Sequence, residues 1–499
     1  MTGAFPAHRN ILIYLSCVVL ALVLGYLLAT PLNFTSLAFV SLVVFVLGFP
    51  LALAWHHNVL IWTWNSSFIV FFLPGQPSLQ VFMVAISLGF SLLTRTLRRS
   101  GRFISAPSVT WPLVILALVI IGTALATGGI GGRALGAGTW GGKRYLGLIG
   151  AILGYFALTA KSLSGPNPKL HVTGYFIFAV TSLFSDLAYA IGPVAYFLFA
   201  FFSTDSASLQ AQTESGLWRL SGVGFAFQAV IYALMLKFTV RGLFDLERPW
   251  RLVGLLVCVG GSLLGGYRSV VIVIGLGFIF QFWYEGLMRT KFLPIVLLTG
   301  LVVGSFGIAF VDKLPLSVQR SISFLPLAVD SQAKHDASST LDWRIQIWRI
   351  VIKEVPDHLI LGKGYAYSGA DYQLTQEAVR RGIYQAYEDT LISGNYHNGI
   401  LTLLVPFGLF GTFAFFWFCW AAFKALKSNY RYGDPALKAV NTFLLSFFAT
   451  RLAFYLVFYG QFDLDLMVFT GVVGLSLALN GGIRTPENSS TPTGQVVAT

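Results

Sequence analysis

Apolar stretches long enough to cross a lipid bilayer recur along this chain, and they constrain its fold more than any other feature. Of its 499 residues, 56% are hydrophobic and 11% are charged, whereas soluble domains carry about 25% charged residues. Candidate spans lie at residues 10–29, 34–54, 59–73, 79–94, 109–127, 145–161, 170–190, 219–240, 252–266, 270–286, 293–311, 398–423, 439–458 and 467–481. The sequence therefore predicts an all-α, polytopic integral membrane protein with about 12–14 transmembrane helices of about 20 residues each.

The same composition excludes other classes of protein. The apolar content excludes a disordered chain, and three cysteines within apolar runs (Cys17, Cys258 and Cys419) exclude a disulfide scaffold. The first apolar stretch has no small-residue cleavage site, so we expect an anchored helix and not a removed signal peptide.

The net charge of +13 would suggest nucleic acid in a soluble protein, so its position along the chain matters. Cytoplasmic loops of membrane proteins hold an excess of Lys and Arg. When the N-terminus is placed in the cytoplasm, the basic clusters at 95–102, 237–251 and 424–438 all fall on that side. The excess then lies on the cytoplasmic face and the outer side is balanced. We expect cytoplasmic termini, a lipid bilayer as partner and no nucleic acid.

Two extramembrane regions are predicted on the outer side. Residues 128–144 form a glycine-rich loop with Arg133, Lys143 and Arg144, and residues 312–396 form a large extracytoplasmic loop. Loops of that length usually have a function. The chain divides into N-terminal transmembrane helices without a recognisable motif (1–210), transmembrane helices that include the Arg268 turn (211–311), the large loop (312–396), C-terminal transmembrane helices (397–483) and a disordered cytoplasmic tail (484–499).

Arg268 is a candidate functional residue, because charges at membrane depth or on short outer turns are costly and often functional. It follows Gly265, Gly266 and Tyr267 in a turn between two apolar stretches. The alternative is an arginine that anchors a helix end at the membrane surface.

Arg344 lies in the large loop, where the apolar residues from Trp343 to Val351 recur at helical spacing and predict an amphipathic helix. We expect this helix to begin at Ser339 or Thr340 and to end at Pro356. Arg344 flanks the apolar stripe. The alternative to a functional role is an amphipathic surface helix whose Arg344 forms an ion pair with a nearby acid such as Asp342.

His397 and Asn398 stand directly before the apolar stretch at 398–423. A helix N-terminus favours anions and disfavours a charged imidazole, so we expect His397 to be neutral and able to accept a proton. The alternative is an interfacial histidine beside a capping Asn398.

Other features give weaker predictions. The glycine-rich loop either brings amides and bases to a phosphate or is a flexible link. Arg451 lies within a span, where we favour a structural ion pair with Asp463 or Asp465 over a metal site at those carboxylates. No zinc spacing and no GxxxxGK[ST] loop is present, so we expect no metal or other cofactor and no ATP hydrolysis.

Several of these residues resemble the bacterial O-antigen ligase and O-antigen polymerase superfamily. The resemblance covers about residues 250–425 and rests on Arg268 after a short outer turn, Asp342-Trp343-Arg344 and residues 361–364 (LGKG) in the large loop. His397-Asn398, followed by Gly408 and Gly411, matches the family pattern H-[N/S/Q]-x9-G-x-x-G.

This resemblance implies a metal-independent glycosyltransferase of lipopolysaccharide or exopolysaccharide biosynthesis. Its donor would be a glycan on undecaprenyl diphosphate, used at the outer face of the bacterial cytoplasmic membrane, and its acceptor a glycan, lipid or protein. It implies catalytic roles for Arg268, Arg344 and His397. Guanidinium forks suit a diphosphate leaving group, and His397 either deprotonates the attacking hydroxyl or hydrogen-bonds the diphosphate. We expect substrate contacts from Arg268, Arg344, Asn398, Arg320, Lys143 and Arg144.

The ligase and the polymerase share this donor chemistry, and both interpretations stay open. A transporter or flippase of lipid-linked oligosaccharides is the alternative from another class. Transporters often show internal repeats and bind substrate at the bilayer midplane, whereas this sequence shows no repeat and its candidate residues cluster outside. A non-catalytic envelope scaffold would not need three convergent cationic or titratable groups.

Overall fold

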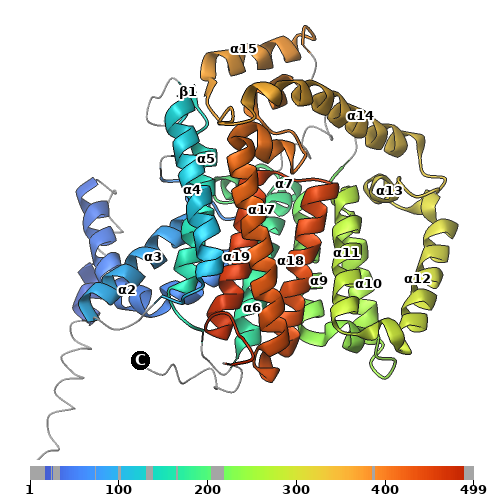
Figure 1. The fold of residues 1–499 in the computed structure, drawn as a ribbon, viewed down its shortest axis with the longest axis horizontal. Helices are drawn as coiled ribbons and strands as arrows, with labels where there is room; N and C mark the ends of the chain where they lie inside the picture. The colour runs from blue at the N-terminus through green and yellow to red at the C-terminus, as the bar shows by residue number, and fades with distance from the viewer. Residues whose placement is uncertain are drawn as a thin grey trace, which may run out of the picture. The chain divides into compact units, whose positions relative to one another are not determined.

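The computed structural model describes residues 17–23, 25, 34–73, 75–98, 103–130, 139–163, 167–203, 218–384 and 388–487. The described chain is mostly helical (Figure 1) and divides into two compact units, Met1–His56 and His57–Thr499. The first unit holds helical residues 17–23 and most of α2 (Phe34–Thr63). The second unit holds the remaining helices and all the candidate site residues.

The helices of the second unit differ widely in length, and short 3-10 helices connect several of them. In chain order they are α3 (Leu79–Arg98), α4 (Pro107–Thr127), α5 (Gly142–Thr159), α6 (Pro168–Ile177), η2 (Phe178–Ser182), α7 (Leu183–Ile191), η3 (Pro193–Ala200), α9 (Ser221–Leu243), α10 (Trp250–Leu263), α11 (Arg268–Tyr284), η4 (Leu287–Arg289), α12 (Phe292–Ala309), η5 (Val311–Lys313), α13 (Leu316–Ile322), α14 (Ser331–Glu354), η6 (Pro356–His358), α15 (Gly369–Arg380), α16 (Glu388–Ser393), α17 (Leu401–Tyr432), η7 (Pro435–Leu437), α18 (Lys438–Val457) and α19 (Phe462–Asn480).

The predicted class, an all-α polytopic membrane protein, is confirmed. Within the described ranges, 8 helical segments are long and apolar enough to cross a membrane, and α10 and α11 are shorter apolar helices. The first expected span, 10–29, lies largely outside the described residues. The total of about 12–14 spans therefore stays a prediction.

The expected span at 59–73 is not one helix. α2 ends at Thr63, and the Ile69 N–H donates to the Phe201 carbonyl at 2.7 Å as part of a short bridge. The polar residues between them explain the break: Asn65 Nδ2 donates to the Tyr175 carbonyl at 2.7 Å, and the Ser67 N–H donates to Thr181 Oγ1 at 3.0 Å. These bonds to residues distant in sequence replace the bonds that a continuing helix would make.

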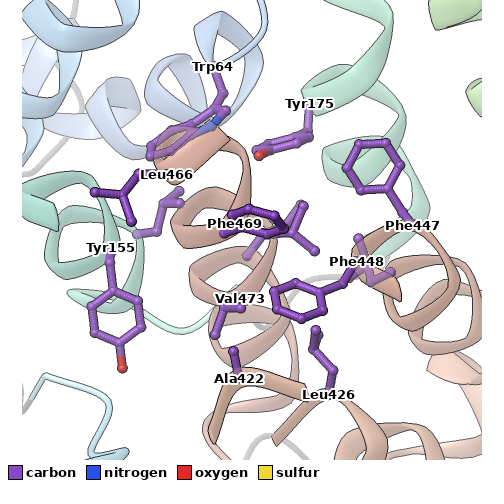
Figure 2. Packing of buried hydrophobic residues seen from close by; sticks show 14 of the residues in the cluster. Trp64, Tyr155, Tyr175, Ala422, Leu426, Phe447, Phe448, Leu466, Phe469 and Val473 are labelled. Atoms are coloured by element: carbon purple, nitrogen blue, oxygen red, sulfur yellow. The ribbon is translucent and has the colours of Figure 1, made fainter. Parts of the chain in front are cut away.

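The core of the second unit is built around α19 (Figure 2). Leu466, Phe469 and Val473 follow one another along this helix and are buried. Phe448 of α18 packs edge-on against Phe469, with ring centroids 5.4 Å apart. Trp64, Tyr155 and Tyr175 cover the other sides, together with Ala422 and Leu426 of α17. This packing fixes α17, α18 and α19 relative to one another, and the loops at their ends carry the candidate site.

The described C-terminal part of the glycine-rich loop, residues 139–144, lies at the same end of the second unit as the large loop. Strand β1 (Thr139–Trp140) pairs antiparallel with β2 (Tyr367–Ser368), with Trp140 opposite Tyr367. We call the end that carries β1, β2 and α13 to α16 the loop end; α14 and α15 lie there together in Figure 1. Arg133 and the tail after Glu487, for which disorder was predicted, lie outside the described residues.

Candidate cationic site at the loop end

Helix α14 positions Arg344. The expected start at Ser339 or Thr340 is wrong, because Asp330 caps the helix: its carboxylate accepts the Gln332 N–H at 2.7 Å and α14 begins at Ser331. The helix ends at Glu354, just before Pro356, as predicted. The predicted apolar stripe is also present, since Ile347 and Val351 are fully buried in a small cluster beside α17.

The side chain of Arg344 turns toward the loop between α18 and α19. Its Cζ lies 5.3 Å from the centroid of the Tyr459 ring, and its buried Nε has no hydrogen-bond partner among the described residues. Asp342 is exposed, and the described ion pairs include none between it and Arg344. The surface ion pair that was the alternative is therefore not formed.

His397 lies between two aromatic rings. Its ring centroid is 5.1 Å from that of Trp343 and 5.4 Å from that of Tyr459. The Nδ1 atom is buried and has no hydrogen-bond partner within the described part of the chain. Burial, with the positive charges of Arg344 and Arg144, lowers the pKa of His397 to about 3. A neutral imidazole was expected from the helix N-terminus, but burial and neighbouring cations are the larger causes.

Asn398 caps α17. Its Oδ1 accepts the N–H groups of Ile400 at 3.0 Å and Leu401 at 3.1 Å. This satisfies two of the backbone donors that a helix start leaves unpaired. The amide nitrogen of Asn398 is the part of the side chain that remains for a substrate.

A second group of arginines gathers around Asp336 of α14. The carboxylate of Asp336 accepts from Arg219 Nη2 at 2.7 Å and from Arg320 Nε. Burial raises the pKa of Asp336, but the guanidinium groups of Arg320 and Arg219 outweigh it and hold the pKa below its usual value. One carboxylate thus neutralises only one of two guanidinium charges.

Arg320 ties α13 to its neighbours. Besides Asp336, its guanidinium donates to the Gly266 carbonyl and to Thr340 Oγ1, the latter at 3.2 Å. All three of its nitrogens are therefore engaged by protein. Arg320 was expected to bind substrate; that stays a prediction, and few of its donors are free for it.

Arg268 connects the two groups. It is the first residue of α11, and its Nη2 donates to the Ala337 carbonyl of α14 at 2.7 Å. Burial lowers the pKa of Arg344, and the nearby charge of Arg268 lowers it further. The structure therefore brings Arg268, Arg344 and His397 into one electrostatic neighbourhood, although they come from α11, α14 and the turn before α17.

Arg144 lies close to His397, whereas the adjacent Lys143 lies at the surface. Arg144 of α5 lies 5.1 Å from the Tyr365 ring centroid, and its Nε is 3.6 Å from a carboxylate oxygen of Asp463. Lys143 is exposed on the same turn. We call Arg144, Arg268, Arg344 and His397 the cationic centre.

The carboxylates near this centre are held by arginines. The predicted ion pair of Arg451 is confirmed: its Nη2 lies 2.5 Å from Asp465, while Asp463 faces Arg144. No group of three His, Cys, Asp or Glu side chains within the described ranges is arranged to hold a metal ion. Asp463 and Asp465 thus serve as counterions in this fold.

The glycines of the motifs at 361–364 and 408–411 build the scaffold. The Lys363 and Gly364 N–H groups donate to the Val405 and Pro406 carbonyls at 2.8 and 3.0 Å. A Cβ on Gly362 would lie 2.1 Å from the Pro406 oxygen, and Gly408 breaks α17 with φ +60. Only glycine allows this approach of two backbones, which anchors the end of the large loop to α17.

Three residues of this site, Arg219, Asp336 and Tyr459, were not expected from the sequence. Arg219 and Asp336 pair across 117 positions of the chain, and Tyr459 comes from a short connection between two spans. Arg219 could have been suspected, because it is a basic residue at the start of a predicted span, on the side predicted to be outer. Nothing in the periodicity indicated Asp336 or Tyr459, because their partners are distant in sequence.

Fold and site together define a polytopic membrane protein with a cationic centre at one end of its helices. Residues 253–416 match the family model described as O-antigen ligase. This match, over about a third of the chain, confirms the resemblance to the O-antigen ligase and polymerase superfamily noted in the sequence. The match supports membrane glycan transfer of the O-antigen ligase type in general. No curated protein matches the sequence.

Proposed function

We propose that this protein transfers or polymerises glycans from an undecaprenyl diphosphate donor at the extracytoplasmic face of the bacterial cytoplasmic membrane. The observation that carries the proposal is Arg344: a largely buried guanidinium, beside Arg268 and His397, that no described carboxylate neutralises. Buried charges are stable only when paired or hydrogen-bonded. A bound diphosphate supplies the missing negative charge.

The arginines suit the leaving group of this reaction. The acceptor hydroxyl oxygen attacks C1 of the donor sugar, and the C1–O bond to the diphosphate breaks with its electron pair. The diphosphate gains negative charge as that bond lengthens, so Arg268 and Arg344 bind the transition state more strongly than the ground state. Direct attack inverts the anomeric centre, and the bond energy of the donor makes ATP unnecessary.

His397 has two roles open to it. As a general base it takes the proton of the acceptor hydroxyl, a contribution of about 10²–10⁴-fold. As a ligand it donates a hydrogen bond to the diphosphate. The bound diphosphate offsets the charges of Arg344 and Arg144, which raises the pKa of His397 toward values useful for proton transfer. The pKa of the free protein therefore does not exclude the first role.

The other residues predicted to contact substrate are expected to contribute to different extents. Arg144 lies within the cationic centre and is placed to reach the sugar or the diphosphate. Asn398 contributes its amide nitrogen, and Arg320 acts mainly by holding Asp336. Lys143, on the surface of α5, would meet only a part of the substrate that extends out of the site.

The membrane orientation is tested with fused reporters. A reporter after Asp371, in the loop end, should read extracytoplasmic, and one after Lys427, near the far end of α17, should read cytoplasmic. The opposite pattern would place the cationic centre in the cytoplasm and contradict this part of the proposal.

Reconstitution tests the reaction itself. Purified protein is mixed with an undecaprenyl-diphosphate-linked glycan and candidate acceptors, and the products are separated by size. Arg268→Ala and His397→Ala should abolish transfer while the proteins remain folded; exposed His335→Ala in α14 is the matched control for the histidine. Stepwise lengthening indicates a polymerase, and single addition a ligase. Movement of the donor across vesicle membranes with no new glycosidic bond would contradict the proposal.

A further inference from the structure

We propose that Tyr459 is a positioning residue, whose ring holds the Arg344 guanidinium and the His397 imidazole in place for transfer. The inference rests on the proposed function and extends it to a residue outside the matched segment 253–416. Tyr459 lies in the connection between α18, which ends at Val457, and α19, which begins at Phe462.

The contacts of the Tyr459 ring carry the inference. Its centroid is 5.3 Å from Arg344 Cζ and 5.4 Å from the centroid of His397. One aromatic ring thus contacts two residues of the cationic centre that come from separate elements. The negative face of an aromatic ring attracts a guanidinium, by about 0.5–2 kcal/mol depending on desolvation.

The connection holds Tyr459 firmly. The Tyr459 N–H donates to the Phe454 carbonyl at 3.0 Å, and the ring centroids of the two residues are 6.3 Å apart. The backbone N–H of Gln461 is bonded to Asp465 at 2.8 Å, and Asp465 also pairs with Arg451. Tyr459 is therefore bonded to the end of α18, and the connection that carries it is bonded to the start of α19.

The phenol itself is not the acting group. Its hydroxyl lies 3.4 Å from Gln461 Oε1, a weak contact. Burial raises the pKa of Tyr459 to about 12, although Arg344 opposes this. The hydroxyl thus stays protonated at neutral pH and is a poor base. The ring is the part that touches Arg344 and His397, so the ring and not the hydroxyl should matter.

The test compares Tyr459→Phe, which keeps the ring, with Tyr459→Leu and Tyr459→Met, which remove it. Transfer by folded, monodisperse protein should stay within about twofold of wild type for Tyr459→Phe. The variants without the ring should lose about 10- to 100-fold in kcat, the scale expected when reacting groups move by about 1 Å. The matched control is Tyr384→Leu, an exposed tyrosine at the loop end.

A second readout separates positioning from folding. Loss of the ring admits water to His397, so the acid limb of kcat/KM should move to higher pH in Tyr459→Leu and not in Tyr459→Phe. The cations facing His397, Arg344 of α14 and Arg144 of α5, remain in both variants, and Trp343 remains as the other ring. A loss of fold lowers the amount of active protein without moving this limb.

The outcomes distinguish this inference from the proposed function. If Tyr459→Leu transfers glycan at the wild-type rate while Arg344→Ala and His397→Ala are inactive, the role of Tyr459 is overturned and the proposed function stands. An equal loss in Tyr459→Phe and Tyr459→Leu overturns it as well, because the hydroxyl would then be essential. If only Tyr459→Phe folds, the ring is a packing element and positioning is rejected. Full transfer by Arg344→Ala and His397→Ala overturns the proposed function itself.

Discussion

Buried polar groups near the two ends of α17 differ in whether they have hydrogen-bond partners. At the far end, Asn441 and Asn480 exchange reciprocal amide hydrogen bonds of 3.0 and 2.9 Å, and Asn441 also donates to the Asn429 carbonyl. All three asparagines are buried. At the loop end, Arg344 Nε and His397 Nδ1 are buried without hydrogen-bond partners among the described residues.

We infer from this difference that the asparagine network serves the fold and that the cationic centre serves binding and catalysis. A closed network of neutral amides rigidifies the junction of α17, α18 and α19 and has no donor left for a ligand. The cationic centre leaves charge and donors unmatched, and this costs stability unless something binds there. Satisfied polar groups are thus expected to control folding, and unsatisfied ones to control activity.

The largest expected effect is on activity at the loop end. Arg344→Ala should lower transfer by about 10²–10³-fold, the scale of losing one donor to a developing charge, while the apparent melting temperature stays unchanged or rises. The measurement is initial rate per folded protein beside thermal unfolding in the same detergent. Arg349→Ala is the control, because Arg349 is an exposed arginine of the same helix. Equal loss of transfer in both variants would show that the buried Arg344 matters no more than an exposed arginine of the same helix.

The next effect is on stability at the far end. Asn441→Leu leaves the partner groups of Asn480 and Asn429 without their bonds, at a cost of about 1–3 kcal/mol for each buried group left unsatisfied. The apparent melting temperature should fall, and transfer per folded molecule should stay near wild type. Thermal unfolding combined with the transfer assay checks this. A folded Asn441→Leu protein with little activity would show that the far end takes part in the reaction.

The smallest expected effect is a shift in pH dependence. Neutral His397 is the form that accepts a proton, and its fraction falls only near and below its pKa. Because that pKa is lowered from 6.5 to about 3, the kcat/KM profile, which reports the free enzyme, should show no acid limb near pH 6.5. Arg144→Gln removes a facing positive charge and should move the limb upward.

The control for this shift is Lys143→Gln, on the exposed neighbouring position, which should leave the profile unchanged. The pH dependence of kcat/KM is compared across the three proteins. An acid limb near 6.5 in the wild type would mean that His397 is more hydrated than its surroundings indicate.

The sequence predicted the fold class and several members of the site, each for a physical reason. The cost of outer charges pointed to Arg268, and the resemblance to the O-antigen ligase and polymerase superfamily added Arg344 and His397, whose motifs are local. The break after Thr63 was missed, because the hydrogen bonds of Asn65 and Ser67 reach residues more than 100 positions away. Arg219, Asp336 and Tyr459 act through space, and one sequence does not show which distant residues meet.

The role proposed for Arg344 is best tested by binding of the lipid diphosphate. The affinities of undecaprenyl diphosphate and of uncharged undecaprenol are measured on wild type, Arg344→Ala and Arg349→Ala in nanodiscs. This role predicts tight binding of the diphosphate alone, and a loss of about 10- to 100-fold in Arg344→Ala only, since a charged hydrogen bond contributes about 1.5–3 kcal/mol. Equal affinity for both lipids, or an unchanged affinity in Arg344→Ala, would contradict it.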